Sequence, residues 1–181
     1  MESTLKFDTL YNTCINNFET GIIVSDVQEK NTMNELYNLI EKMENPNDVY
    51  DRLGQLLDLN ENNIEIMFAI VFKLLKKFEK NAVFQIQGVA ILRYIITCEQ
   101  FDVHVTNEYI DIIRESLDIV DTNKNKNIGI DDDQIVEFIE NCIIILYKMN
   151  VNGNELKILE KMYNNYSNNL THVHMFYTDV I

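Results

Sequence analysis

Apolar side chains recur along the chain at the three- and four-residue spacing of amphipathic helices. The first such run consists of Phe7, Leu10, Tyr11, Cys14, Ile15 and Phe18. It predicts a helix near the N-terminus. Residues 19–31 break the rhythm, apart from the short apolar patch GIIV, and we expect a loop there. Thr32 and Glu35 have the spacing of a capping box, which predicts that the next helix starts at residue 32.

Five further stripes follow. They are Leu36, Leu39, Ile40 and Met43; Leu53, Leu56 and Leu57; Ile64, Met67, Phe68, Val71, Leu75 and Phe78; Tyr109, Ile112, Ile113, Ser116, Leu117 and Val120; and Ile135, Ile139, Cys142, Ile143, Leu146 and Met149. The stripe from Ile64 is widened by neighbouring apolar residues, and the segment VFQIQGVAILRYIITC from Val83 is apolar nearly all round. We expect these two helices at the centre of the core. Asn154 can cap a last helix, and the tail 166–181 stays unassigned.

The only proline lies in the segment NPND, where it predicts a break between helices. Five glycines and one proline are few for 181 residues. Turn-rich β-folds need these residues at many corners, so their scarcity favours helices. The sequence therefore predicts an all-α fold and one all-helical domain over residues 1–181. Within it we expect an N-terminal helix and loop (1–31), helical repeats (32–165) and a tail (166–181).

A weak repeat links the predicted helices. VYDRLGQLLDL from Val49 and VFQIQGVAILRYI from Val83 align with a valine, an aromatic residue, a glycine and an aliphatic run in register. A similar helix precedes each segment, and a third copy fits if residues 122–133 are an insertion. The repeating unit is a helix, a turn and a more buried helix, as in helical-repeat proteins.

The segment LLKKFEKNAVFQIQGVAILRYI resembles an armadillo repeat, with Gln87 as the glutamine and Gly88 as the small residue of its last helix. The resemblance implies a right-handed α-solenoid whose groove binds proteins, without catalysis. The asparagine with which that family grips extended peptides is not identifiable here. A compact multi-helix bundle would produce similar apolar stripes and is the alternative fold.

The charge of the chain narrows the class of partner. The formal net charge is −14. Binding to nucleic acid requires clustered Lys and Arg, so a nucleic-acid surface is not expected. The acidity favours basic protein surfaces or divalent cations as partners. The longest apolar runs are too short to span a bilayer, and the N-terminus lacks a secretory pattern. We expect a cytoplasmic protein, with the nucleus as the alternative location.

The most specific candidate for a ligand site is DTNKNKNIGIDDDQIVEFIE, residues 121–140, which resembles an EF-hand loop. Its calcium ligands would be Asp121, Asn123, Asn125 and Asp132. Lys126 replaces the glycine that an EF-hand needs at its sharp turn, and the terminal acid is Asp rather than Glu. The simpler interpretation is a polar insertion, with residues 131–133 placing acids at a helix N-terminus.

No other residues form a recognisable chemical site. Cys14, Cys98 and Cys142 fall at apolar positions, where buried thiols are expected. His172 and His174 alternate and could face one metal, but no further ligand is near, and His104 has no visible partner. No catalytic or cofactor motif is present. We therefore expect a non-enzymatic interaction or scaffold module that binds another protein, with a calcium-responsive protein as the alternative function.

Overall fold

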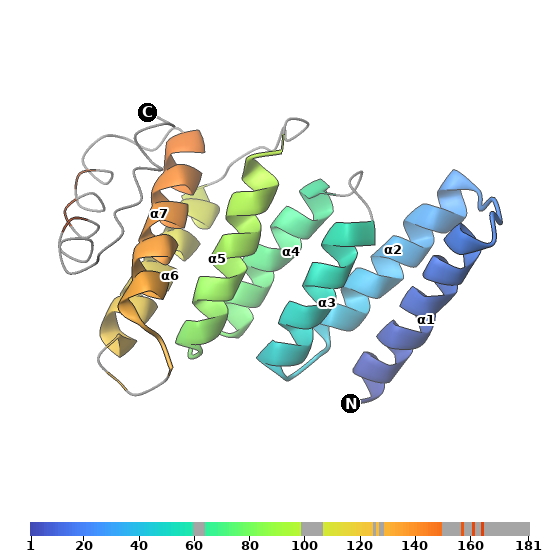
Figure 1. The fold of residues 1–181 in the computed structure, drawn as a ribbon, viewed down its shortest axis with the longest axis horizontal. Helices are drawn as coiled ribbons and strands as arrows, with labels where there is room; N and C mark the ends of the chain where they lie inside the picture. The colour runs from blue at the N-terminus through green and yellow to red at the C-terminus, as the bar shows by residue number, and fades with distance from the viewer. Residues whose placement is uncertain are drawn as a thin grey trace. The chain divides into compact units, whose positions relative to one another are not determined.

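The computed structural model describes residues 1–59, 64–98, 107–124, 126, 129–149, 157, 161 and 164. All the secondary-structure elements it describes are α-helices, which confirms the all-α prediction (Figure 1). They are α1 (Glu2–Glu19), α2 (Asp26–Glu41), α3 (Pro46–Leu59), α4 (Ile64–Lys77), α5 (Ala82–Ile96), α6 (Asn107–Asn123) and α7 (Asp132–Lys148). The chain divides into two compact units, Met1–Asn63 and Ile64–Ile181. Each unit is described below by itself.

The first unit holds α1, α2 and α3. The predicted stripe of α2 is buried, as are Leu53 and Leu56 of α3. Pro46 occupies the first position of α3, where its missing N–H is tolerated and its fixed φ suits a helix. Arg52 of α3 ties the unit together, because its Nε and Nη2 reach the two carboxylate oxygens of Asp8 on α1 at 3.3 and 3.0 Å. Its Nη1 also pairs with Asp48 at 3.3 Å.

The start of α2 differs from the prediction. The helix begins at Asp26, and the hydroxyl of Ser25 caps it by accepting from the Gln28 backbone N–H at 3.3 Å. Thr32 therefore lies inside α2 instead of capping it, and the expected loop ends before residue 26. The boundary at residue 31 between loop and repeats falls within this helix. Serine is as good an N-cap as threonine, so spacing alone could not choose between the two sites.

The second unit contains two helical hairpins, α4–α5 and α6–α7. Helix α5 packs against α4, α6 and α7, while α4 also contacts α6. The first helices of the two hairpins run in the same direction, and so do the second helices (Figure 1). The described part of this unit is therefore a pair of stacked hairpins, in which α4 contacts α6 and α5 contacts α7.

Two residues of α5 set how closely α4 packs on it. A Cβ on Gly88 would lie 2.7 Å from Cδ2 of the buried Leu75, which explains why this position is glycine. Gly88, the small residue of the proposed resemblance, thus lies where α4 and α5 approach closely. Gln85 is the glutamine of α5 that is buried in this packing. Its amide nitrogen donates to the carbonyls of Leu75 and Phe78 at the end of α4, both at 3.0 Å.

Helix α7 is more buried than its narrow stripe predicts. The predicted residues are buried, and so are Val136, Phe138, Glu140, Asn141, Ile144 and Ile145. The acids at its start have the expected place: Asp131 is the N-cap and forms a capping box with Gln134. The core of this unit therefore includes α7 together with the predicted pair α4 and α5.

Candidate functional site

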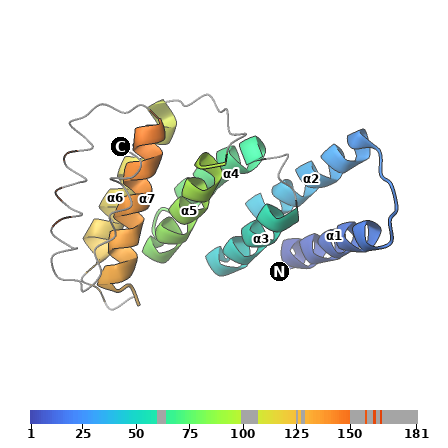
Figure 2. The same cartoon turned by 45° about the horizontal axis from the view of Figure 1, so that its top comes forward.

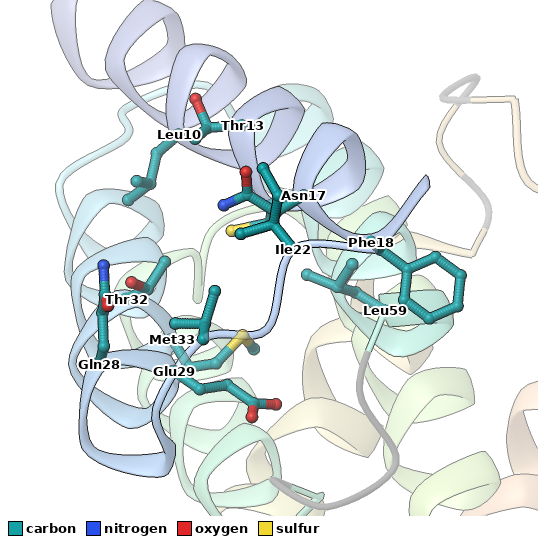
Figure 3. Close-up of a pocket in the computed structure, with 12 residues that line it drawn as sticks. Leu10, Thr13, Asn17, Phe18, Ile22, Gln28, Glu29, Thr32, Met33 and Leu59 are labelled. Carbon is teal, nitrogen blue, oxygen red and sulfur yellow. The ribbon is translucent and has the colours of Figure 1, made fainter. Parts of the chain in front are cut away.

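A groove opens within residues 1–63, and we call it the α1–α2 groove. Its volume is about 340 Å³, and it is lined chiefly by α1, α2 and the connection between them (Figure 3). The apolar part of the lining comes from Leu10, Cys14, Met33 and Leu59, with Phe18 and Ile22 beside them. The amphipathic pattern of α1 predicted a buried stripe, but Phe7 is its only fully buried member. Leu10, Cys14 and Phe18 of the same stripe line this hollow.

The turn after α1 follows from one glycine. Gly21 has a φ of 71°, in the left-handed region that glycine adopts without strain. The Gly21 N–H donates to the Phe18 carbonyl at 3.2 Å, and the Ile22 N–H donates to the Asn17 carbonyl at 2.9 Å. This pair of bonds is the Schellman motif that ends many helices. It directs the chain from the end of α1 into the connection to α2 (Figure 2), and both Phe18 and Ile22 line the groove (Figure 3).

Exposed apolar side chains occur close together along the chain at this turn and at the start of α2. Phe18 is 85% exposed, Ile22 is 58% exposed, Ile23 is 97% exposed and Val27 is 71% exposed. We call these four residues the apolar rim. Single exposed apolar residues are ordinary, but a contiguous group bordered by polar residues marks an interaction surface. Phe18 and Ile22 of the rim line the groove; Ile23 directly follows Ile22, and Val27 lies in the first turn of α2.

Polar and acidic groups border the apolar surface. Gln28, Glu29 and Thr32 of α2 form one wall of the groove, opposite Thr13 and Asn17 of α1 (Figure 3). The Ser25 cap holds the first turn of α2 in place and so fixes where this wall begins. An apolar floor between polar walls can orient a bound apolar face.

Two ionisable groups in or near the groove are affected by partial burial and by nearby carboxylates. Burial raises the pKa of the Cys14 thiol, and the nearby Glu29 carboxylate raises it further. Burial likewise raises the pKa of Tyr11, and the Asp58 carboxylate adds to the effect. A catalytic cysteine needs a lowered pKa, so the surroundings of Cys14 are the reverse of those of a nucleophile.

The EF-hand candidates occupy different local structures. Asp121 and Asn123 lie in the last turn of α6 instead of a loop. Lys124 Nζ pairs with Asp121 at 2.7 Å, and the Asn123 side-chain amide donates to the Ile119 carbonyl at 2.7 Å. Asp132 is the first residue of α7, and Asn125 lies outside the described residues. The link between the helices is thus residues 124–131, shorter than the expected insertion at 122–133.

The remaining candidates bring no site together. Only Cys142 is a fully buried thiol; Cys14 and Cys98 are half-buried, so the expectation of three buried thiols was wrong for two. His104, His172 and His174, with the tail 166–181, lie outside the described residues. In the part of the chain that the structure describes, no three His, Cys, Asp or Glu side chains cluster as metal ligands. No described helix is long and apolar enough to cross a bilayer.

Comparison with known proteins adds no relative. No family model, no curated protein and no solved structure matches the chain. The function must therefore be argued from the groove and its charges.

Proposed function

We propose that this protein is an interaction module that binds another protein through the α1–α2 groove and its apolar rim. One observation carries the proposal: Phe18 and Ile22 line an apolar hollow although each is more than half exposed, and Ile23 and Val27, close to them along the chain, are more than half exposed as well. Exposing such side chains to water is unfavourable by about 25 cal/mol for each Å² of apolar surface. A partner that covers them gains this free energy.

A protein partner suits this surface better than a small molecule. Pockets for small ligands enclose most of the ligand and run from about 300 to 1,000 Å³. The groove is at the small end of that range, with a volume of about 340 Å³. A ligand confined to it would leave Ile23 and Val27 in water. A protein surface can fill the groove and cover the rim together.

We also propose that the module is non-enzymatic. The groove contains one thiol, and burial raises its pKa. Among the described residues that line the groove, Glu29 is the only carboxylate, so these residues offer no acid–base pair to a substrate. These features support binding without catalysis.

For the second unit, we propose that the hairpins α4–α5 and α6–α7 are armadillo-like repeats. Their support is the stacking of α5 on α7 and of α4 on α6, with Gly88 at a close contact between α5 and α4. The repeats would then be a scaffold, and the groove of the first unit would be the binding surface.

A capture experiment with paired variants tests the proposed binding surface. The full chain, Phe18→Gln and Leu5→Gln would each be immobilised and exposed to lysate from the native source. Leu5 is the matched control, because it is an apolar residue of α1 that is 69% exposed and does not line the groove. We expect a protein that wild type and Leu5→Gln retain and that Phe18→Gln loses. Equal retention by all three chains would contradict the proposal.

A further inference from the structure

We propose that the occupant of the α1–α2 groove is an amphipathic helix of the partner whose apolar face is flanked by Lys and Arg. The inference rests on the proposed function, because it names the chemistry of the partner that the groove binds. It depends on two separate properties of the first unit, namely the shape of the apolar surface and the distribution of charge around it.

The shape of the apolar surface suits a helix. The apolar lining residues of α1 and α2, with the exposed Phe18 and Ile22 among them, give an apolar strip between two helices, which is the setting in which an amphipathic helix lies with its apolar face down. Such a helix presents anchors at every third or fourth residue. One anchor can fill the space beside Met33 and Leu59, while the next can cover Phe18 and Ile22. A single extended side chain could not do both.

The charge around the strip is negative. Glu19, Asp26 and Glu29 lie next to rim or groove residues along the chain, and Asp58 precedes Leu59 of the floor. Lys30 is the only basic residue between positions 7 and 41. Across residues 1–63 there are 12 Asp and Glu against 4 Lys and Arg, a formal charge of −8. Opposite charges at the border of an apolar patch favour encounter and select the partner.

The same charge argues against other occupants. A second copy of this chain would bring its own carboxylates against the rim, and like charges across an interface cost several kcal/mol. The cytoplasmic leaflet of a membrane is also negative and attracts basic segments instead. Nucleic acid is repelled for the same reason. A basic helix combines apolar anchors with the complementary charge.

Model peptides of defined charge test the inference on the full chain. Each peptide has roughly 15 residues, enough to form a helix on binding, with leucines on one face. The other face carries Lys in the first peptide, Gln in the second and Glu in the third. The protein contains no tryptophan, so a single Trp on the apolar face of each peptide reports its burial without background. A fourth peptide has the Lys composition in scrambled order.

We expect the Lys peptide to bind most tightly and to lose affinity as salt is raised. Glu29→Gln with Asp58→Asn should weaken its binding by at least about threefold. Glu35→Gln with Asp51→Asn is the matched control, since it also removes two negative charges, but from exposed residues that neither line the groove nor directly adjoin a lining residue in the chain. Phe18→Gln should weaken the binding of every amphipathic peptide by at least about fivefold, and Leu5→Gln should leave this binding unchanged.

The outcomes separate this inference from the proposed function. If the Gln or Glu peptide binds as tightly as the Lys peptide and Phe18→Gln weakens it, the groove binds helices but the charge inference is wrong. If no amphipathic peptide binds, or Phe18→Gln binds like wild type, both the inference and the proposed groove fail. If the scrambled peptide binds as tightly as the Lys peptide, charge alone accounts for the binding, and the inference is wrong. If the protein binds vesicles containing phosphatidylserine more strongly than it binds the Lys peptide, the partner is a membrane instead of a helix, and the inference is wrong.

Discussion

The hydroxyl of Ser116 on α6 donates a hydrogen bond of 2.6 Å to the side-chain oxygen of Gln85 on α5, inside the core of the second unit. The Gln85 amide nitrogen in turn donates to the Leu75 and Phe78 carbonyls of the α4 end. Carbonyls in the last turn of a helix have no partner within the helix. One buried side chain therefore joins three helices and satisfies these groups.

Ser116→Ala should destabilise the protein more than a substitution that removes one exposed contact. The change leaves the Gln85 oxygen buried without its donor, which costs about 1–3 kcal/mol of unfolding free energy. Urea denaturation measures the effect. Asp118→Ala is the control on the same helix, because Asp118 is exposed; it should change the free energy by less than about 0.5 kcal/mol. Equal values for the two variants would contradict the importance of the buried bond.

Gly88→Ala and Gly54→Ala should have opposite effects. Both glycines lie inside helices, where alanine is intrinsically favoured by about 0.5–1 kcal/mol. A Cβ at Gly88 would approach the buried Leu75 side chain to 2.7 Å, whereas a Cβ at Gly54 has nothing within 4 Å. We expect Gly88→Ala to destabilise by about 1–3 kcal/mol because of overpacking. Gly54→Ala should stabilise the protein.

Urea denaturation of both glycine variants gives the comparison. The two substitutions are chemically the same, so they differ only in surroundings. If Gly88→Ala also stabilises the protein, then α4 can shift away from α5, and the close contact does not limit the packing.

The helices were predictable because burial follows the apolar spacing. Nearly all residues of the predicted stripes of α2, α4 and α7 are buried, and the break at Pro46 lies where the sequence places it. The start of α2 was missed because Ser25 and Thr32 are equally plausible caps by residue type. The Gln85 hydrogen bonds were also missed, since periodicity shows that a glutamine lies on a buried face but not which carbonyls it reaches.

The groove was harder to predict than the helices. The pattern of α1 is that of a buried helix, and periodicity cannot show that its partners leave Phe18 exposed. One signal was present: the apolar patch GIIV stands in a segment that was otherwise expected to be a polar loop. Gly21 in the same patch is the kind of residue that ends a helix. Together they could have indicated an exposed apolar turn.

Tyr37 should make stability depend on pH in the alkaline range. Burial raises its pKa from 10.0 to about 12. The folded protein thus favours the neutral phenol, so the contribution is fully present below about pH 10 and is lost as the pH rises towards 12. The loss is at most about 2–3 kcal/mol. Urea denaturation at several pH values should show a smaller decline for Tyr37→Phe than for wild type.

An exposed tyrosine supplies the control for this pH experiment. Tyr94 is 57% exposed, so Tyr94→Phe should follow the wild-type decline. If Tyr37→Phe declines as steeply as wild type, then Tyr37 ionises in the folded protein as freely as in the unfolded chain.

Calcium should bind weakly or not at all at residues 121–132. Asp121 is engaged with Lys124, and Asn123 is engaged with the α6 backbone, so both contacts must break before these groups can serve as ligands. Calorimetric titration of the chain with millimolar calcium should give no binding heat. Heat that disappears in Asp121→Ala and Asp132→Ala would contradict this expectation and would restore the calcium-responsive alternative.

Hydrogen exchange tests the central claim most directly. The exchange of backbone amides would be measured for the full chain alone and for the full chain bound to its partner. The partner is the protein that the wild-type chain retains in the capture experiment and that Phe18→Gln does not retain. A bound partner excludes water and slows local opening, so amides of the surface it covers should exchange more slowly. We predict protection in residues 17–29, the segment that carries the apolar rim and one groove wall. Protection confined to residues 64–149, with residues 17–29 unchanged, would contradict the claim that this groove is the binding site.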